Sequence, residues 1–270
     1  MTDKPAPAAY RAPAQLTLTA LTTIPLVTAG DDLGALIAAA CEREGVKLAS
    51  GDVLVVAQKI VSKAEGRRVR LATVEASPRA VELAARTGKD PRLVELILRE
   101  SRSVLRIARE ALIVEHRLGF VLANAGIDQS NVEAEASDPC ALLLPEDPDR
   151  SAAALRSRIQ ALTGATVGVI INDSIGRAWR LGTIGTAIGV AGLKALVDMR
   201  GMPDMNGRLL RSTDVAVADE LASAASLCMG QAAERRPVVI VRGVEGIVSA
   251  SDDNRGARQL LRPLTEDLFR

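Results

Sequence analysis

The stretch TVGVIINDS, residues 166–174, begins as a nearly continuous apolar run and ends in three polar residues. A short run of this kind, rich in Val and Ile, predicts a strand that is buried on both faces. Two similar runs, DVLVVAQKIV at 52–61 and PVVIV at 237–241, predict further core strands. We therefore expect a buried sheet, with a carboxylate directly after the strand at 166–171.

The segments around these strands alternate irregularly between helix and strand. The sequence ALIVEHRLGFVLAN at 111–124 predicts a hairpin that turns at 117–119. This irregular order favours an α+β fold, with mixed sheets and packed helices, over a regular doubly wound sheet. The other predicted elements are strands at 15–21 and 183–191; helices at 32–44, 78–87, 91–101 (capped by Asp90) and 150–162 (capped by Asp149); a long helix capped by Thr213 that ends at Gly230; and a charged, helical tail at 254–269.

Composition narrows the class of protein. The chain has 270 residues with 48% hydrophobic and 25% charged side chains, which is enough to bury a core and excludes wholesale disorder. A net charge of +1 gives no broad basic surface for nucleic acid, and one Trp, one Tyr and two Phe cannot provide stacking platforms for bases. We therefore expect no nucleic-acid partner.

Cysteine usage and the termini bear on localisation and domains. Three widely separated cysteines without a CxxC pair are typical of a reducing compartment, so we expect a cytoplasmic protein. The first residues lack the apolar core of a signal peptide, and no run reaches the roughly 20 apolar residues of a membrane span. We expect a loose tail at 1–14 and one functional unit at 15–270, because no linker divides the chain; a boundary between subdomains is left open.

Two aspartates stand just beyond apolar runs and are followed by small polar residues. Asp128 is followed by Asn131 and Asp173 by Ser174. Hard divalent cations such as Mg²⁺ or Mn²⁺ take oxygen ligands and commonly keep substrate phosphates in their shell. The pair therefore indicates a phosphate-bridging cation site, although a helix cap or a closed turn would explain either aspartate alone.

Basic side chains near these points are candidate phosphate ligands. Lys59 and Lys63 sit at the end of the strand run at 52–61, where an ammonium group could meet phosphate oxygens, although a surface role is the simpler interpretation of either lysine alone. Arg177 and Arg180 flank Trp179 after the Asp173 strand and are weaker candidates.

Several familiar chemistries lack support. His116, the single histidine, is interpreted as structural, and no Ser or Cys stands out as its nucleophilic partner. One His also excludes a multi-histidine zinc site, and neither a Walker-type GxxxxGK[ST] loop nor GxGxxG is present. A bound nucleotide would therefore be held by another kind of loop.

Six segments together resemble the coenzyme F420-0:L-glutamate ligase family, in family order and over about residues 15–245. They are IPLVTAGDDL at 24–33, GDVLVVAQKIVSKAEGR at 51–67, NAGIDQSNV at 124–132, LLLPEDPDRSA at 142–152, VGVIINDSIGRAWRLGTIGTAIG at 167–189, and TDVAVADELASAASLCMGQ at 213–231. The resemblance implies the family's α+β fold and an intertwined homodimer.

The resemblance also implies roles for individual residues. The nucleotide-binding positions of the family correspond to Ile24, Pro25, Leu26, Val27, Gln58, Lys59, Lys63, Asn131, Met229 and Gly230. The first divalent ion would be held by Asp128 and Asp173, and the second by Ser174 and Gln231. Two positions depart from the family: Gln58 stands where members often carry Ser, and Gln231 stands where at least one relative has a Glu ligand.

The implied activity is that of a GTP-dependent ligase. It would add L-glutamate by an amide, γ-glutamyl linkage to the deazaflavin precursor F420-0 through an acyl phosphate, with Asp128, Asp173 and Lys63 as catalytic groups. Two Mg²⁺ or Mn²⁺ ions would be cofactors, and K⁺ is a further candidate. A related ligase that joins a different carboxylate and amine, and a non-catalytic nucleotide-binding module, remain alternatives. The number of glutamates, the acceptor, the preferred nucleotide and the metal stay open.

Overall fold

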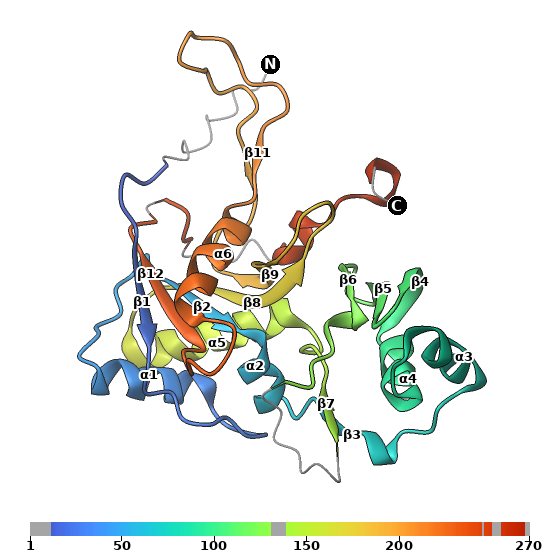
Figure 1. Cartoon of the computed structure of the whole chain (residues 1–270). Helices are drawn as coiled ribbons and strands as arrows, with labels where there is room; N and C mark the ends of the chain where they lie inside the picture. The colour runs from blue at the N-terminus through green and yellow to red at the C-terminus, as the bar shows by residue number, and fades with distance from the viewer. Residues whose placement is uncertain (1–11, 131–138, 245, 250–254, 268–270) are drawn as a thin grey trace.

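The computed structural model describes residues 12–130, 139–244, 246–249 and 255–267. Its centre is a five-stranded sheet in the order β1-β12-β2-β8-β9, formed by Thr17–Leu21, Val238–Arg242, Val53–Ala57, Gly168–Gly176 and Thr183–Ala191 (Figure 1). β2 and β8 are parallel, and the other neighbouring strands are antiparallel. The sheet is therefore mixed, which confirms the predicted α+β class.

Alternation along β2 explains why both faces of this sheet are apolar. Leu54 and Val56 pack into the same hydrophobic cluster as residues of α1 (Leu33–Arg43) and α5 (Pro148–Thr163). Val53 and Val55 point to the opposite face and pack with α6 (Val217–Met229). Because successive strand residues point to opposite faces, a continuous apolar run is what a sheet covered on both sides requires. Figure 1 shows α6 on one side of the sheet and α1 with α5 on the other.

A second lobe, defined here as the elements from β3 to β7, has its own hydrophobic cluster. Its helices and its three-stranded antiparallel sheet, in the order β4-β5-β6, lie to one side of the central sheet (Figure 1). The predicted hairpin at 111–124 is confirmed as β5 and β6, whereas β4 was not predicted. The lobe contains β3 (Arg68–Arg70), the 3₁₀ turn η1 (Leu71–Thr73), α3 (Pro78–Thr87), α4 (Pro91–Arg99), β4 (Ser101–Ala108), β5 (Ala111–His116), β6 (Val121–Ala123), the 3₁₀ turn η2 (Asn124–Gly126) and β7 (Cys140–Leu142).

Two corrections to the predicted elements bear directly on the site. The strand predicted over 52–61 ends at Ala57, and Gln58 begins the helix α2 (Gln58–Ala64). β-branched Ile60 and Val61 favour a strand locally, but both are buried against the core from the helix, so packing overrides propensity. The strand predicted to end at 171 continues to Gly176, because β9 pairs with it beyond the last residue of β2.

The other corrections concern helix ends. Helix α5 begins at Pro148 with Asp147 as its cap, because Pro is well suited to the first helical position; Asp149 instead accepts hydrogen bonds from the backbone of Val190 and Ala257. Thr213 does not cap α6, since the strand β11 (Asp214–Val215), paired with β10 (Val197–Asp198), intervenes. Within residues 255–267 the tail forms the 3₁₀ turns η3 (Ala257–Leu260) and η4 (Leu264–Glu266) in place of a helix, and Pro263 separates the two turns.

None of the three cysteines, all of which lie in described segments, forms a disulfide. None of the helices in the described segments is both long and apolar enough to cross a bilayer.

Candidate functional site

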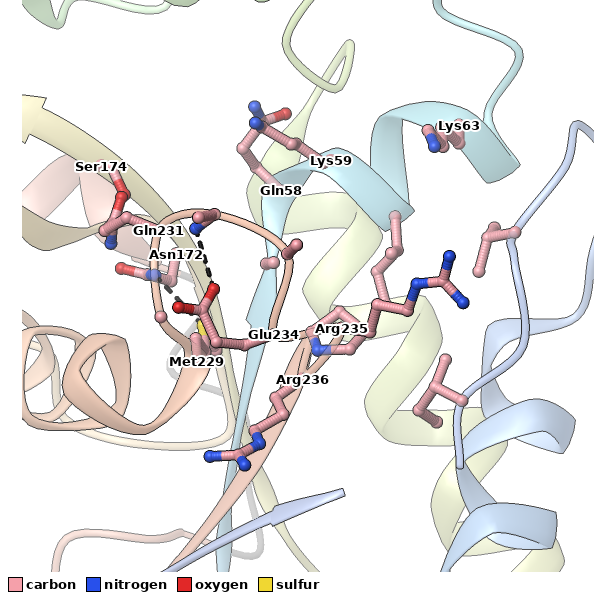
Figure 2. Close-up of a pocket in the computed structure, with 18 of the residues that line it drawn as sticks. Gln58, Lys59, Lys63, Asn172, Ser174, Met229, Gln231, Glu234, Arg235 and Arg236 are labelled. Atoms are coloured by element: carbon pink, nitrogen blue, oxygen red, sulfur yellow. Dashed lines mark hydrogen bonds between the residues drawn. The ribbon is translucent and has the colours of Figure 1, made fainter. Parts of the chain in front are cut away.

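A cavity of about 640 Å³ opens where β2 ends and α2 begins. One wall is the loop from Ile24 to Val27, and the other is the segment that follows α6 (Figure 2). The lining residues are Ile24, Pro25, Leu26, Val27, Ala57, Gln58, Lys59, Ile60, Lys63, Asn172, Asp173, Ser174 and residues 229–237. Nine of the ten predicted nucleotide-binding residues therefore line one cavity, while Asn131 lies outside the described residues.

The loop of residues 24–27 supplies an apolar wall. Gly30, in the left-handed region with φ of 89°, donates its N–H to the carbonyl of Ala64 at 2.9 Å and so fixes the loop against α2. Val27 is buried in the core, whereas Leu26 remains 64% exposed beside the cavity. An exposed aliphatic surface next to cationic side chains is suited to a ligand with an apolar, planar part and a charged part.

Four cationic side chains border the cavity, those of Lys59, Lys63, Arg235 and Arg236. Lys59 and Lys63 are four residues apart on α2 and therefore share one face of the helix. Figure 2 shows the Arg235 side chain extending from the segment after α6 towards the cavity. Neither Lys63 nor Arg235 has an ion-pair partner among the described residues, so both charges are available to an anionic ligand.

Asp128 is held by the second lobe. Its backbone pairs with Leu142 in a β-bridge, with N–H to carbonyl distances of 3.0 and 2.8 Å. Its Oδ1 accepts the Ser130 N–H at 2.6 Å, and its Oδ2 lies 2.6 Å from the Lys59 Nζ. Burial would raise the pKa of Asp128, but the hydrogen bonds from Lys59 and Ser130 bring it below its ordinary value. The carboxylate is therefore held in its charged form.

Asp173 comes from the part of β8 that extends past β2. Its Oδ1 accepts the N–H of Ser174 at 2.8 Å. Burial, followed by the negative charge of Asp128, raises the pKa of Asp173 to about 6, while the Lys59 charge and a hydrogen bond from Gln58 act in the opposite direction. The two predicted carboxylates are therefore close enough to repel each other, and a cation between them would relieve that repulsion.

Ser174 and Gln231 meet at the edge of the cavity. The Ser174 hydroxyl donates to the Gln231 Oε1 at 2.9 Å, and the Gln231 Nε2 donates to the Ser226 Oγ at 3.0 Å. Gln231 thus offers an amide oxygen on the side of Ser174. An amide oxygen can coordinate a cation, but it brings no charge.

The donor set fits a hard divalent cation. In the described part of the chain, no group of three or more His, Cys, Asp and Glu side chains gathers as a metal site. Asp128, Asp173, Ser174 and Gln231 together provide only oxygen ligands, which suits Mg²⁺ or Mn²⁺ and does not suit a thiolate- or imidazole-binding metal. Such a site would be completed by water or by ligand oxygens.

Asn172 lines the cavity although sequence reasoning did not select it. Its side chain is 5% exposed, its Nδ2 lies 3.6 Å from the Met229 Sδ, and its Oδ1 has no hydrogen-bond partner in the described residues. Arg235 was also missed. The available signals were the place of Asn172 beside Asp173 and the basic pair at 235–236 before a core strand.

The remaining candidates lie elsewhere. Arg177, Trp179 and Arg180 belong to the turn between β8 and β9 and do not line the cavity. His116 is fully buried; its Nδ1 accepts the Leu118 N–H at 3.0 Å, which confirms a structural histidine.

Comparison with known proteins gives one consistent result. The chain matches the family described as F420-0:Gamma-glutamyl ligase over residues 22–243. It is 49% identical over 247 residues to a protein of Methanothermobacter thermautotrophicus named coenzyme F420:L-glutamate ligase, covering 92% of this chain and 96% of that protein. Proteins of the same name from Methanopyrus kandleri, 49% identical over 90% of this chain and 93% of the relative, and Methanocaldococcus jannaschii, 44% identical over 82% and 85%, are also similar.

Proposed function

The chain belongs to the F420-0:Gamma-glutamyl ligase family, and we propose that it joins L-glutamate to the deazaflavin cofactor precursor F420-0 through an amide bond at the expense of GTP. The observation that carries the proposal is the gathering of the family's motif residues around one cavity that has an apolar wall, four bordering cationic side chains and Asp173, whose charge interacts with that of Asp128. This is the combination that a nucleoside triphosphate bound with a cation requires.

The reaction would take place in two steps. An oxygen of the terminal carboxylate of F420-0 forms a bond to the γ-phosphorus of GTP while the bond between that phosphorus and the β,γ-bridging oxygen breaks, and GDP leaves. The α-amino nitrogen of glutamate, after losing a proton, then attacks the acyl carbon of the resulting acyl phosphate. Orthophosphate leaves and the amide remains.

Each group of residues has a role in this scheme. The apolar wall at Ile24 to Val27 would contact the nucleoside, and Lys63 and Arg235 would meet the phosphates. Asp128 and Asp173 would hold the divalent cation, which when bound neutralises charge on the transferred phosphoryl group. The protein supplies positioning and charge, so the scheme needs neither a histidine nor a cysteine nucleophile.

A direct assay tests the proposal. The protein is incubated with GTP, Mn²⁺, L-glutamate and F420-0, and the products are followed by mass spectrometry and by release of GDP and orthophosphate. We expect one orthophosphate for each glutamyl residue added, and no release when F420-0 is omitted. Product with another amine but not with glutamate would favour the related-ligase alternative. GTP binding that ignores the metal, without any turnover, would favour the non-catalytic alternative.

A further inference from the structure

Lys59 already occupies the position of a cation beside the carboxylates. Its Nζ lies 2.6 Å from the Asp128 Oδ2 and 3.0 Å from the Ser130 Oγ. Its charge also lowers the pKa of Asp173. The ammonium group is therefore paired directly with Asp128, one of the proposed cation ligands, while its side chain borders the cavity.

A divalent cation and this ammonium group compete for the same oxygens. Mg²⁺ and a carboxylate oxygen usually lie about 2.1 Å apart. A divalent ion bound to Asp128 would therefore be repelled by the Lys59 ammonium group, which lies 2.6 Å from the same carboxylate. Relief requires that the lysine move. Its flexible four-carbon stem permits this, and its side chain is 31% exposed, so it has access to solvent.

Given the proposed function, on which this step rests, we propose that Lys59 is an internal counter-ion that is exchanged for the divalent cation and then moves to the phosphates of the nucleotide. Lys63 lies one helical turn further along the same face of α2, so the released ammonium group would join a charge that already faces the cavity.

The exchange makes cation binding and nucleotide binding cooperative. Without nucleotide, the cation must displace Lys59 into water, and its affinity is lowered by the ion pair it breaks. With nucleotide bound, the displaced ammonium group gains phosphate partners, and these contacts offset the free energy lost with the Lys59–Asp128 ion pair. A coupling of this kind is reciprocal, so the metal should improve nucleotide affinity by the same factor.

The test measures Mn²⁺ binding without nucleotide. Electron paramagnetic resonance reports the concentration of free Mn²⁺ during the titration. In Lys59→Met, which keeps an unbranched side chain but removes the charge, we expect Mn²⁺ affinity to rise about fivefold, the size expected for loss of a partly buried ion pair. Lys59→Arg keeps a positive charge near Asp128 and should bind Mn²⁺ like the unaltered protein. Lys194→Met is the matched control, because Lys194 is exposed and follows the end of β9 that is opposite the site.

A second titration in the presence of GTP measures the coupling. The unaltered protein should bind Mn²⁺ more tightly with GTP than without it, and this enhancement should shrink in Lys59→Met. The proposal is overturned if Lys59→Met binds Mn²⁺ no more tightly than the unaltered protein does. It is also overturned if neither protein binds Mn²⁺. If Lys59→Met shows the expected changes in Mn²⁺ binding but the unaltered protein forms no amide, only the proposed function is contradicted.

Discussion

Replacement of Glu100 by Gln should destabilise the protein through a buried ionic cluster that joins the second lobe to the central sheet. Glu100 follows α4 and its side chain is 12% exposed. Its Oε2 lies 3.1 Å from Arg67 NH2, 3.1 Å from Arg117 Nε and 3.5 Å from His116 Nε2. Arg67 also donates its Nε–H to the carbonyl of Leu144 at 2.9 Å, so the cluster connects the segments on both sides of the lobe.

The expected magnitude follows from the pKa of Glu100. Burial alone would raise this pKa, but the His116 Nε2 at 3.5 Å and the charges of Arg117 and Arg67 lower it from 4.5 to about 2. At about 1.4 kcal/mol per pKa unit, the charged carboxylate contributes about 3 kcal/mol to the free energy of unfolding at neutral pH. Because the folded pKa is the lower one, the contribution is complete above about pH 4.5, falls to about half near pH 3 and disappears below about pH 2.

Urea denaturation of Glu100→Gln and the unaltered protein, measured at pH 7 and at pH 3, checks this reasoning. The difference in the free energy of unfolding should be about 3 kcal/mol at pH 7 and about half of that at pH 3. Glu82→Gln is the control, because Glu82 is 54% exposed and its pair with Arg79 should contribute less than about 1 kcal/mol. A difference for Glu100→Gln that is the same at both pH values would refute the assignment of the effect to the charge.

Three further changes probe the cavity and the packing next to it. Asp173→Asn should lower the rate of amide formation at least about 100-fold with an unchanged circular dichroism spectrum, since it removes a proposed cation ligand; activity within about twofold of normal would remove that role. Gly185→Ala should lower the melting temperature and reduce the free energy of unfolding by about 2 kcal/mol, because the Cβ of the new alanine would lie 2.4 Å from the Ala222 carbonyl oxygen; an unchanged melting curve would contradict this contact. Arg235→Gln should weaken GTP binding about tenfold in calorimetry, as expected for loss of a charged hydrogen bond, whereas Arg180→Gln, at a residue that does not line the cavity, should not; equal effects would argue against a specific contact.

The core strands could be predicted because their signal is local. Val53 to Val56 and Val238 to Val241 are apolar at every position, and only a sheet covered on both faces buries such runs. The ends of elements could not be predicted in the same way, because they depend on partners that are distant in sequence. Asp173 was placed after a strand, yet it lies within β8, since β9 continues to pair with it beyond the end of β2.

In the candidate site, too, local signals could be predicted from the sequence and long-range contacts could not. Asp128 and Asp173 were selected because each follows an apolar run, and their charges interact in the structure. Periodicity could not indicate that Lys59 pairs with Asp128, because 69 positions separate them and the contact depends on how the second lobe docks. Asn172 was missed for a related reason: its orphaned amide oxygen becomes noticeable only when burial and hydrogen-bond partners are known.

The division of the site between two bodies gives the docking of the second lobe a functional meaning. Asp173 belongs to the central sheet, whereas Asp128 is fixed through its backbone to Leu142 of the lobe. The separation of the two carboxylates is therefore set by the interface rather than by either hydrophobic core. That interface contains the Glu100 cluster on one side and the Lys59–Asp128 pair on the other. Since exchange of Lys59 for a cation would replace one cross-link with another between the same two bodies, the lobe can stay docked while the charge at the site changes.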